Sequence, residues 1–247
     1  FSSIKLNILK ELSSSKNIHL KTKINNISIN SKEIKKNDIF FAIKGKSKDG
    51  NFFTEEAFKR GASLAVVNKY KKKFNHIKVK DTLKFLTEAS SILRENTQSK
   101  IIAITGSCGK TSLKELVGKT LNKISKTTYS QKSFNNKFGV PLSLFNLKQK
   151  DEFGVFEIGM DKKGEIDYLS KIIKPDVGVI TNITYAHAEN FKNIKQIALA
   201  KSEIIENIKD GGSIILNADD QFHNFHKKIA QKKKLQIYSF SIKNKNC

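Results

Sequence analysis

The chain has 247 residues, which is enough for one large domain or two smaller ones. Its 46 Lys and Arg residues exceed its 23 Asp and Glu residues, but the lysines are spread along the whole chain without interleaved aromatics, so the +23 net charge does not indicate a nucleic-acid-binding stripe. Two cysteines exclude a disulfide framework, and no apolar run approaches the ~18 residues of a membrane span. We expect a cytoplasmic protein with no membrane insertion and no nucleic-acid partner.

The first 80 residues predict a small α/β unit. Apolar residues near the start favour a short helix and a turn. Another helix is predicted over residues 54–60, with Gly61 as its C-terminal stop. Short apolar or alternating runs predict four strands, over residues 27–31, 38–43, 64–67 and 77–79.

A single helix is predicted over residues 82–95, followed by a polar stretch over residues 96–100. One face of this helix is apolar or small, made of Leu83, Leu86, Ala89, Ser90 and Leu93. We therefore divide the chain into an N-terminal domain, a linker helix and a larger second domain, with bounds 1–80, 81–100 and 101–247.

Residues 101–112 read Ile-Ile-Ala-Ile-Thr-Gly-Ser-Cys-Gly-Lys-Thr-Ser and predict a strand, a glycine loop and a helix start. Such a loop lets backbone N–H groups approach phosphates, whose charge the helix N-terminus favours. Lys110 would reach the terminal phosphates, and the Thr111 hydroxyl would bind Mg²⁺. Ile104 stands where the longer form of the motif has Gly, so this is the shorter G-x-x-G-K-[ST] loop. The alternative is a glycine turn that happens to precede a helix.

The predicted phosphate-loop helix has an apolar pattern at helical spacing. The residues in this pattern are Leu113, Leu116, Val117, Thr120, Leu121 and Ile124.

Strands and helices alternate after this helix. A shaped loop over residues 133–141 leads to a helix at 142–147, and a second helix over 194–208 is stopped by Gly211 and Gly212. Apolar strands are predicted at residues 153–158, 177–181 and 213–216. This alternation indicates a doubly wound, mostly parallel sheet, in which ligands bind beyond the carboxyl ends of the strands.

Glu157 and His187 both lie at such strand ends. A carboxylate that closes an apolar strand is costly unless it is paired or bound to a cation, so Glu157 is a candidate Mg²⁺ ligand. The alternative for Glu157 is a structural carboxylate with a protein partner. His187 follows the strand at 177–181, and a structural role is its alternative.

Lys201 falls on the apolar face of the helix predicted over residues 194–208. Burial would disfavour its ammonium form and lower its pKa. The alternative is a side chain that extends along the surface and keeps its charge in water.

Four stretches together resemble the Mur ligase family of bacterial cell-wall synthesis. They are the glycine loop over residues 105–115, the Asn-Asn-x-x-Gly-x-Pro loop over 135–141, the Glu-x-Gly stretch over 157–166, and the His and Lys segment over 186–204. Within the family they are similar to the branch that adds D-alanyl-D-alanine to UDP-N-acetylmuramoyl-tripeptide.

The resemblance implies an ATP-dependent ligase that works through an acyl phosphate, with ATP and two Mg²⁺ ions. Lys110, His187 and Lys201 would be catalytic; Thr111, Glu157, His187 and Lys201, as a carbamate, would hold the metals. The ATP-binding residues would be Thr105, Gly106, Ser107, Cys108, Gly109, Lys110, Thr111, Ser112, Asn135 and Asn136.

The resemblance also implies that the N-terminal part is a UDP-binding domain and the second a P-loop ATPase domain. The residues expected to contact the UDP substrate are Ser31, Lys32, Lys44, Gly45, Asp49 and Gly50. Lys32 stands where the family has Arg, and Asn51 where it commonly has His. The family has a further C-terminal domain, so we interpret the chain as a fragment, inactive alone, of a monomeric enzyme.

Three other interpretations stay open on the sequence. The first is a sister Mur ligase that adds a single amino acid, and the second is a ligase like folylpolyglutamate synthase, which lacks the UDP domain. The third is a basic nucleic-acid-binding NTPase, which predicts salt-sensitive affinity for DNA or RNA and has no use for Lys201.

Overall fold

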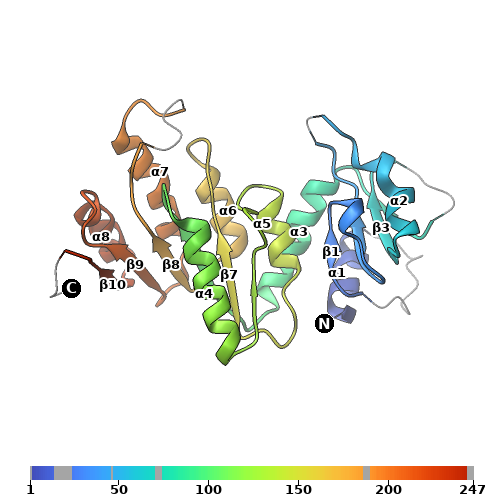
Figure 1. Ribbon diagram of the computed structural model, residues 1–247, viewed down its shortest axis with the longest axis horizontal. Helices are drawn as coiled ribbons and strands as arrows, with labels where there is room; N and C mark the ends of the chain where they lie inside the picture. Colours follow the sequence, from blue (N-terminus) through green and yellow to red (C-terminus); the bar gives the residue numbers. More distant parts are fainter. Residues whose placement is uncertain (1, 14–23, 46, 70–73, 186–189, 244–247) are drawn as a thin grey trace. The chain divides into compact units, whose positions relative to one another are not determined.

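The structure, a computed structural model, describes residues 2–13, 24–45, 47–69, 74–185 and 190–243. Contacts between Cα atoms divide the chain into two compact units, Phe1–Thr97 and Gln98–Cys247 (Figure 1). The helix that the sequence analysis treats as a linker belongs to the first unit by this division.

The first unit contains a four-stranded sheet in which all neighbouring strands are parallel, in the order β1-β2-β3-β4. The strands are β1 Ile27–Ser28, β2 Ile39–Phe41, β3 Leu64–Val67 and β4 His76–Lys78. Strand β1 is shorter than predicted because the Asn30 side chain accepts a hydrogen bond from the Lys32 N–H and starts a 3₁₀ turn there.

Helices cover this sheet at positions close to those predicted. They are α1 Ser2–Ser13, α2 Thr54–Lys59 and α3 Thr82–Glu95, with 3₁₀ turns η1 Ser31–Glu33 and η2 Gly50–Phe53. Helix α3 has the predicted bounds because Asp81 caps it, accepting hydrogen bonds from the N–H groups of Leu83 and Lys84 at 2.8 and 3.0 Å. The Thr82 hydroxyl then donates to the Ala42 carbonyl at 3.0 Å and joins α3 to the end of β2.

The second unit contains a six-stranded sheet in the order β10-β9-β8-β5-β7-β6, with every neighbouring pair parallel. Its strands are β5 Lys100–Thr105, β6 Thr127–Tyr129, β7 Phe153–Glu157, β8 Val177–Ile180, β9 Ser213–Asn217 and β10 Gln236–Phe240. The predicted α/β class with parallel sheets is confirmed. Strands β6 and β10 were not predicted.

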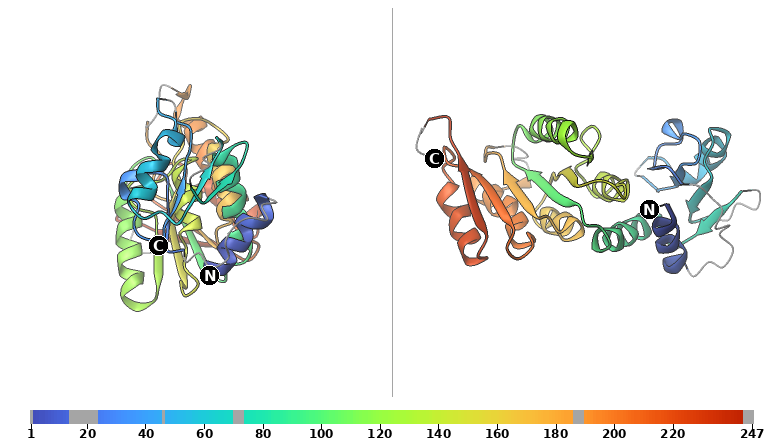
Figure 2. Two further views of the ribbon diagram at one scale, coloured as in Figure 1. Left: turned by 90° about the vertical axis from the view of Figure 1, so that its right-hand side faces the viewer. Right: turned by 90° about the horizontal axis from the view of Figure 1, so that it is seen from below.

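Five helices connect these strands: α4 Lys110–Ile124, α5 Gly139–Phe145, α6 Glu165–Ile173, α7 Ile194–Glu206 and α8 His223–Lys232. The strand order reverses after β6, so right-handed crossovers place α4 on one face and α5 to α8 on the other. The right-hand view of Figure 2 separates α4 from α6, α7 and α8 by the strands. In the part of the chain that the structure describes, no helix has the length and apolarity needed to cross a membrane.

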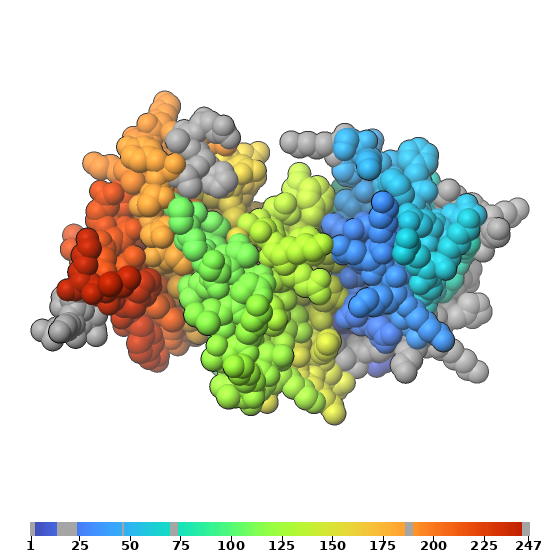
Figure 3. Space-filling view, in the orientation of Figure 1, coloured from blue at the N-terminus to red at the C-terminus, as the bar shows by residue number. Residues whose placement is uncertain are grey.

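Helix α4 is present, but part of its predicted apolar face is wrong. Leu116 and Ile124 are 65% and 78% exposed. Figure 3 shows α4 at the surface of the molecule. The side chains that pack on the sheet are Leu113, Val117 and Leu121. A helix with a sheet on one side only needs a narrow apolar stripe, so the outer positions of the pattern stay in water.

Helix α5 also differs from its prediction, because it begins at Gly139 rather than at residue 142. The Asn136 side chain accepts hydrogen bonds from the N–H groups of Phe138 and Gly139, each at 3.1 Å, and so starts the helix early. Pro141 is accommodated because the first turn of a helix does not need its missing N–H.

Candidate active site

The carboxyl ends of the parallel strands meet at one edge of the second sheet. The register pairs Ile104 with Glu157 and Thr105 with Ile180, so the ends of β5, β7 and β8 are level. The loop over residues 106–109 leaves β5 at this edge and enters α4 directly. Side chains at the ends of three strands can therefore reach the same loop.

Two glycines give the loop its shape. Gly106 has φ 145° and Gly109 has φ 79°, both in the region that side-chain-bearing residues avoid. A Cβ at Gly106 would overlap the Thr181 hydroxyl, while a Cβ at Gly109 would meet nothing within 4 Å. The path of the chain requires glycine at 106 because Thr181, directly after β8, leaves no room there.

The segment after β8 holds the loop through several hydrogen bonds. The N–H of Ser107 donates to the Asn182 carbonyl and that of Cys108 to the Asn182 side-chain oxygen, both at 2.9 Å. The Thr181 hydroxyl donates to the Cys108 carbonyl at 2.7 Å, and the Ser107 hydroxyl to the Thr184 carbonyl at 3.0 Å. No role was predicted for Thr181, Asn182 or Thr184 from the sequence. The sequence feature that could have identified them is a run of polar residues directly after a buried strand.

The Lys110 side chain folds back onto the loop that precedes it. Its Nζ donates to the carbonyl oxygens of Gly106 and Ser107 at 2.8 and 3.1 Å. The N–H groups of the first turn of α4 have no partner within that helix and carry its positive dipole end. The loop therefore presents a cation and helix N–H groups at one place, the arrangement that binds phosphate.

Glu157 is 1% exposed at the end of β7 and accepts two side-chain hydrogen bonds. The Thr111 hydroxyl donates to its Oε2 at 2.7 Å, and the Asn135 amide donates to its Oε1 at 2.8 Å. A hydroxyl and a carboxylate in contact offer the hard oxygen ligands that Mg²⁺ prefers, so this pair fits the ion. Among the described residues, no group of three or more His, Cys, Asp and Glu side chains forms a metal site.

Lys201 reaches the same loop from α7. It is 1% exposed, and its Nζ donates to the Gly106 carbonyl at 2.9 Å. Burial, and after it the positive charge of Lys110, lowers the pKa of Lys201 to about 7. The alternative of a side chain that extends into solvent is therefore wrong.

The remaining predicted nucleotide residues have different surroundings. Ser112 is exposed on α4, and Asn136 caps α5. The buried Thr105 hydroxyl has no hydrogen-bond partner among the described residues. His187 lies outside the described residues.

In the first unit, four of the six predicted UDP-contacting residues share one turn. Lys44 pairs with Asp49 across the turn, the Gly45 N–H donates to the Lys48 carbonyl at 2.8 Å, and a Cβ at Gly50 would lie 2.7 Å from the Ala42 backbone. Hydrogen bonds from the side chain and backbone of Asn51, then from Lys69, lower the pKa of Asp49 to about 2.

The other two predicted UDP-contacting residues are on η1. The Ser31 hydroxyl donates to the Glu56 carboxylate at 2.7 Å, and the Lys32 side chain is exposed. Ser31 thus joins η1 to α2.

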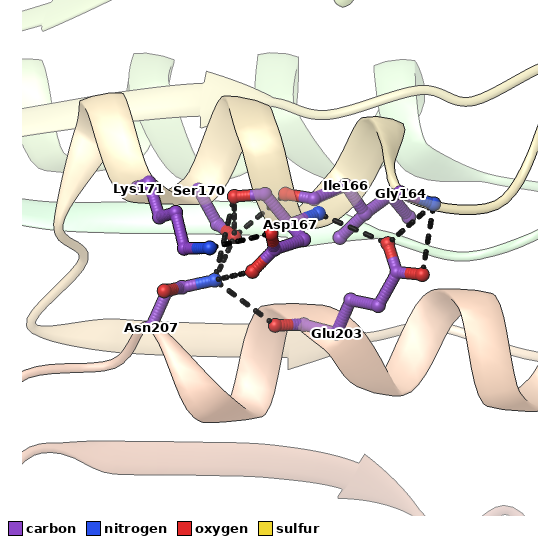
Figure 4. A network of polar contacts seen from close by, with 7 residues as sticks. All are labelled: Gly164, Ile166, Asp167, Ser170, Lys171, Glu203 and Asn207. Atoms are coloured by element: carbon purple, nitrogen blue, oxygen red, sulfur yellow. Dashed lines mark hydrogen bonds and ion pairs between the residues drawn. The ribbon is translucent and has the colours of Figure 1, made fainter.

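Glu203 anchors the helix that carries Lys201. Figure 4 shows its carboxylate pointing at the start of α6, where it accepts hydrogen bonds from the N–H groups of Gly164 and Asp167 at 2.9 and 3.0 Å. Asn207, just after α7, donates to the Asp167 carboxylate and the Ser170 hydroxyl, both at 2.9 Å. These contacts tie the C-terminal end of α7 to the first two turns of α6.

Comparison with known proteins gives matches along most of the chain. Residues 104–247 match the model of the Mur ligase middle domain, and residues 23–91 match that of the Mur ligase family, catalytic domain. The UDP-N-acetylmuramoyl-tripeptide–D-alanyl-D-alanine ligase of Buchnera aphidicola subsp. Acyrthosiphon pisum is 39% identical over 223 residues, which cover 90% of this chain and 49% of that protein.

Solved structures match as well. MurF from Acinetobacter baumannii superposes with a TM-score of 0.82 at 33% identity, over 95% of this chain and 52% of that one. The MurF ligase from Thermotoga maritima, in complex with ADP, gives a TM-score of 0.74 at 28% identity, over 89% of this chain and 51% of that one. The chain thus spans about half the length of the curated relatives it matches. More than half of its residues match the middle-domain model alone, and by that match the chain belongs to the Mur ligase family.

Proposed function

We propose that the chain is the nucleotide- and UDP-substrate-binding part of an ATP-dependent ligase that adds D-alanyl-D-alanine to UDP-N-acetylmuramoyl-tripeptide. The observation that carries this proposal is the convergence of Lys110, Thr111, Glu157 and Lys201 on one phosphate-type loop. The names of similar proteins supply the substrates.

The proposed reaction has two steps. A carboxylate oxygen of the tripeptide attacks the γ-phosphorus of ATP, which forms an acyl phosphate and releases ADP. The amine of D-alanyl-D-alanine then attacks the acyl carbon, loses a proton, and expels inorganic phosphate. In phosphoryl transfer the protein contributes mainly positioning and charge neutralisation, and here Lys110 and the N-terminus of α4 face the phosphates.

Thr111 and Glu157 would hold one Mg²⁺ in this scheme. A bound Mg²⁺ would neutralise charge that develops on the transferred phosphoryl group. We assign a second Mg²⁺ to His187 and to Lys201 in its carbamate form. This assignment follows from the family resemblance of the segment over residues 186–204.

Carbamate formation at Lys201 is chemically reasonable in this environment. With a pKa of about 7, a large fraction of the side chain is a neutral amine at neutral pH. The amine nitrogen adds to the carbon of CO₂ and loses a proton, which replaces a buried cation by an anion with two oxygens. Such an anion would be attracted to Lys110, which shares the Gly106 carbonyl with Lys201.

The UDP moiety would bind the first unit. We propose that Ser31, Lys32 and the turn that carries Lys44, Gly45, Asp49 and Gly50 contact it. The loss of the bidentate Arg contact at position 32 leaves a single ammonium for a phosphate oxygen. The protein would act in the cytoplasm, where ATP is available. It would be a monomer and would not bind nucleic acid.

A phosphate-release assay tests this proposal. The chain is joined in frame to the second half of the Buchnera relative, and release from ATP is measured with UDP-N-acetylmuramoyl-tripeptide and either D-alanyl-D-alanine or single amino acids. The proposal expects release with the dipeptide, whereas release with a single amino acid would identify a sister ligase. Salt-sensitive binding of DNA or RNA, with no release in either case, would favour the nucleic-acid alternative.

The unjoined chain is the matched control in that assay. It is expected to bind nucleotide but to form no pentapeptide product, because the family's C-terminal domain contributes to amino-acid binding. Product formed by residues 1–247 alone would contradict this part of the proposal.

A further inference from the structure

Lys114 is the most deeply buried lysine of α4 and has no role in the scheme above. Its side chain is 0% exposed, one helical turn after Lys110. Its Nζ donates to the Glu115 carboxylate at 2.6 Å, the Ser130 carbonyl at 2.6 Å and the Lys132 carbonyl at 2.9 Å. An ammonium has three N–H donors, so all of them are used. A fully buried cation with a complete set of acceptors indicates a specific structural task.

The two backbone acceptors of Lys114 lie in the segment between β6 and α5. Lys132 has φ 51°, a left-handed conformation that is costly for a residue with a side chain. Its carbonyl is the one that points at the Lys114 ammonium. The ammonium therefore stabilises a turn that the sequence of this segment does not favour by itself.

The same segment contacts Glu157 twice. The Ser130 hydroxyl accepts a hydrogen bond from the Glu157 N–H at 3.4 Å, and the Asn135 amide donates to the Glu157 carboxylate at 2.8 Å. The Asn135 carbonyl also accepts from the Gly159 N–H at 2.7 Å, just after the strand that carries Glu157. Ser130 and Asn135 thus flank Glu157 from the segment that Lys114 holds.

We propose that Lys114 is a positioning residue for the cation site: by fixing residues 130–135 against α4, it sets the orientation in which the Glu157 carboxylate meets the Thr111 hydroxyl. This inference rests on the proposed binding of nucleotide and Mg²⁺. Three residues of α4 would then serve this site. Lys110 and Thr111 contact the loop and Glu157, and Lys114 holds the segment over residues 130–135.

Lysine suits this position better than other residues of similar size. Methionine has a similar length but no donor, and it would remove the Lys114 hydrogen bonds to the Ser130 and Lys132 carbonyls, the first of which is buried. Glutamine keeps an N–H₂ group but is shorter and uncharged. The Lys114 ammonium also lowers the pKa of Glu115, which keeps that carboxylate charged as its counter-ion.

Lys119 provides a matched control. It lies on the same helix and pairs with the other oxygen of the same Glu115 carboxylate at 3.4 Å, but its side chain is 66% exposed. Lys119→Met therefore removes a lysine and a Glu115 contact without touching residues 130–135.

The experiment measures binding of adenylyl imidodiphosphate to the chain by calorimetry, with Mg²⁺ and with EDTA. Lys114→Met is expected to weaken binding in Mg²⁺ by about 10-fold to 100-fold, the usual effect of losing an outer contact of a metal ligand, and to leave binding in EDTA nearly unchanged. Asn135→Ala is expected to do the same, and Lys119→Met to match the wild type. Hydrogen exchange without nucleotide should show faster exchange over residues 130–139 in Lys114→Met only.

The outcomes separate the two proposals. If the wild type does not bind the analogue in Mg²⁺, the proposed function fails. If the wild type binds and Lys114→Met lowers affinity equally in Mg²⁺ and EDTA, Lys114 only supports the fold and the inference is overturned. Should the Met variant not fold, Lys114→Gln replaces it. If the ratio of the affinities in Mg²⁺ and in EDTA is then the same as in the wild type, the inference is overturned.

Discussion

Lys110 and Lys201 donate to the same acceptor, the carbonyl oxygen of Gly106, at 2.8 and 2.9 Å. One lysine comes from the helix that follows the loop and the other from α7. Two ammonium groups at one carbonyl repel each other, which contributes to the lowered pKa of Lys201. The carbamate proposed for Lys201 would replace this repulsion by attraction to Lys110.

Lys201→Met should change how stability depends on pH. The pKa of Lys201 is lowered from 10.5 to about 7, so between these values the unfolded chain binds more protons than the folded one, and the free energy of unfolding rises with pH. Each tenfold change in the acid constant corresponds to about 1.4 kcal/mol, so the rise is at most a few kcal/mol.

Urea unfolding at several pH values in this window, without CO₂, measures the effect. The Met variant should be at least as stable as the wild type near neutral pH. Its free energy of unfolding should not show the rise with pH that Lys201 causes in the wild type. Lys195→Met, an exposed change on the same helix, should keep the wild-type slope. If the free energy of unfolding of Lys201→Met depended on pH as in the wild type, the pKa of Lys201 would not be lowered in the folded protein.

Glu157→Gln should raise the Mg²⁺ concentration needed for nucleotide binding. The amide keeps the shape of the side chain but removes the charge that attracts a hard cation. A calorimetric titration with the ATP analogue at increasing Mg²⁺ measures the midpoint, which should rise at least about tenfold. Glu152→Gln, at an exposed position just before β7, is the control. An unchanged midpoint in Glu157→Gln would assign Glu157 to structure alone.

Gly106→Ala should disrupt the loop. The new Cβ would overlap the Thr181 hydroxyl, and φ 145° is unfavourable for alanine, so both a clash and strain follow. We expect loss of analogue binding and a clear fall in the thermal midpoint. Gly211→Ala is the control because it also has positive φ, 73°, but open space around its Cβ. Equal melting and equal binding in the two variants would show that the close approach to Thr181 has no role.

Glu203→Ala should destabilise the contact between α6 and α7 shown in Figure 4. The carboxylate caps two N–H groups at the start of α6, and losing such a cap costs about 0.5–2 kcal/mol. Urea unfolding measures the difference against Glu206→Ala, an exposed change on the same helix. If the two variants are equally stable, the cap contributes nothing measurable.

Local signals predicted most of the fold. Helix α3 was predicted with its full bounds because Asp81 caps it and its apolar spacing is regular. Strand β3 was predicted as well, since its four residues are all buried and apolar or small. Helix α8 and strand β10 were missed because they are polar or half-exposed, and β6 because its sequence, Thr-Thr-Tyr, has no apolar run.

The candidate site was predictable only in part. The spacing of the loop and the apolar surroundings identified Lys110, Thr111, Glu157 and Lys201, which the structure brings together. Asn182 and Lys114 could not be identified in this way. Asn182 meets Cys108, 74 residues away, only because β8 pairs with β5. The backbone acceptors of Lys114 lie 16 and 18 residues away, beyond β6, in a segment without a regular pattern. The catalytic and metal-binding roles of the site residues stay predictions.

A calorimetric titration of the chain with adenylyl imidodiphosphate in Mg²⁺, for the wild type and Lys110→Ala, tests whether residues 106–111 bind nucleotide. The wild type should show saturable one-to-one binding. Affinity should fall by at least about tenfold in the variant, because a charge-assisted contact to phosphate contributes about 1.5–3 kcal/mol. Lys119→Ala should bind like the wild type. Equal affinities of the wild type and Lys110→Ala, or no binding by either, would contradict the assignment of residues 106–111 as the nucleotide site.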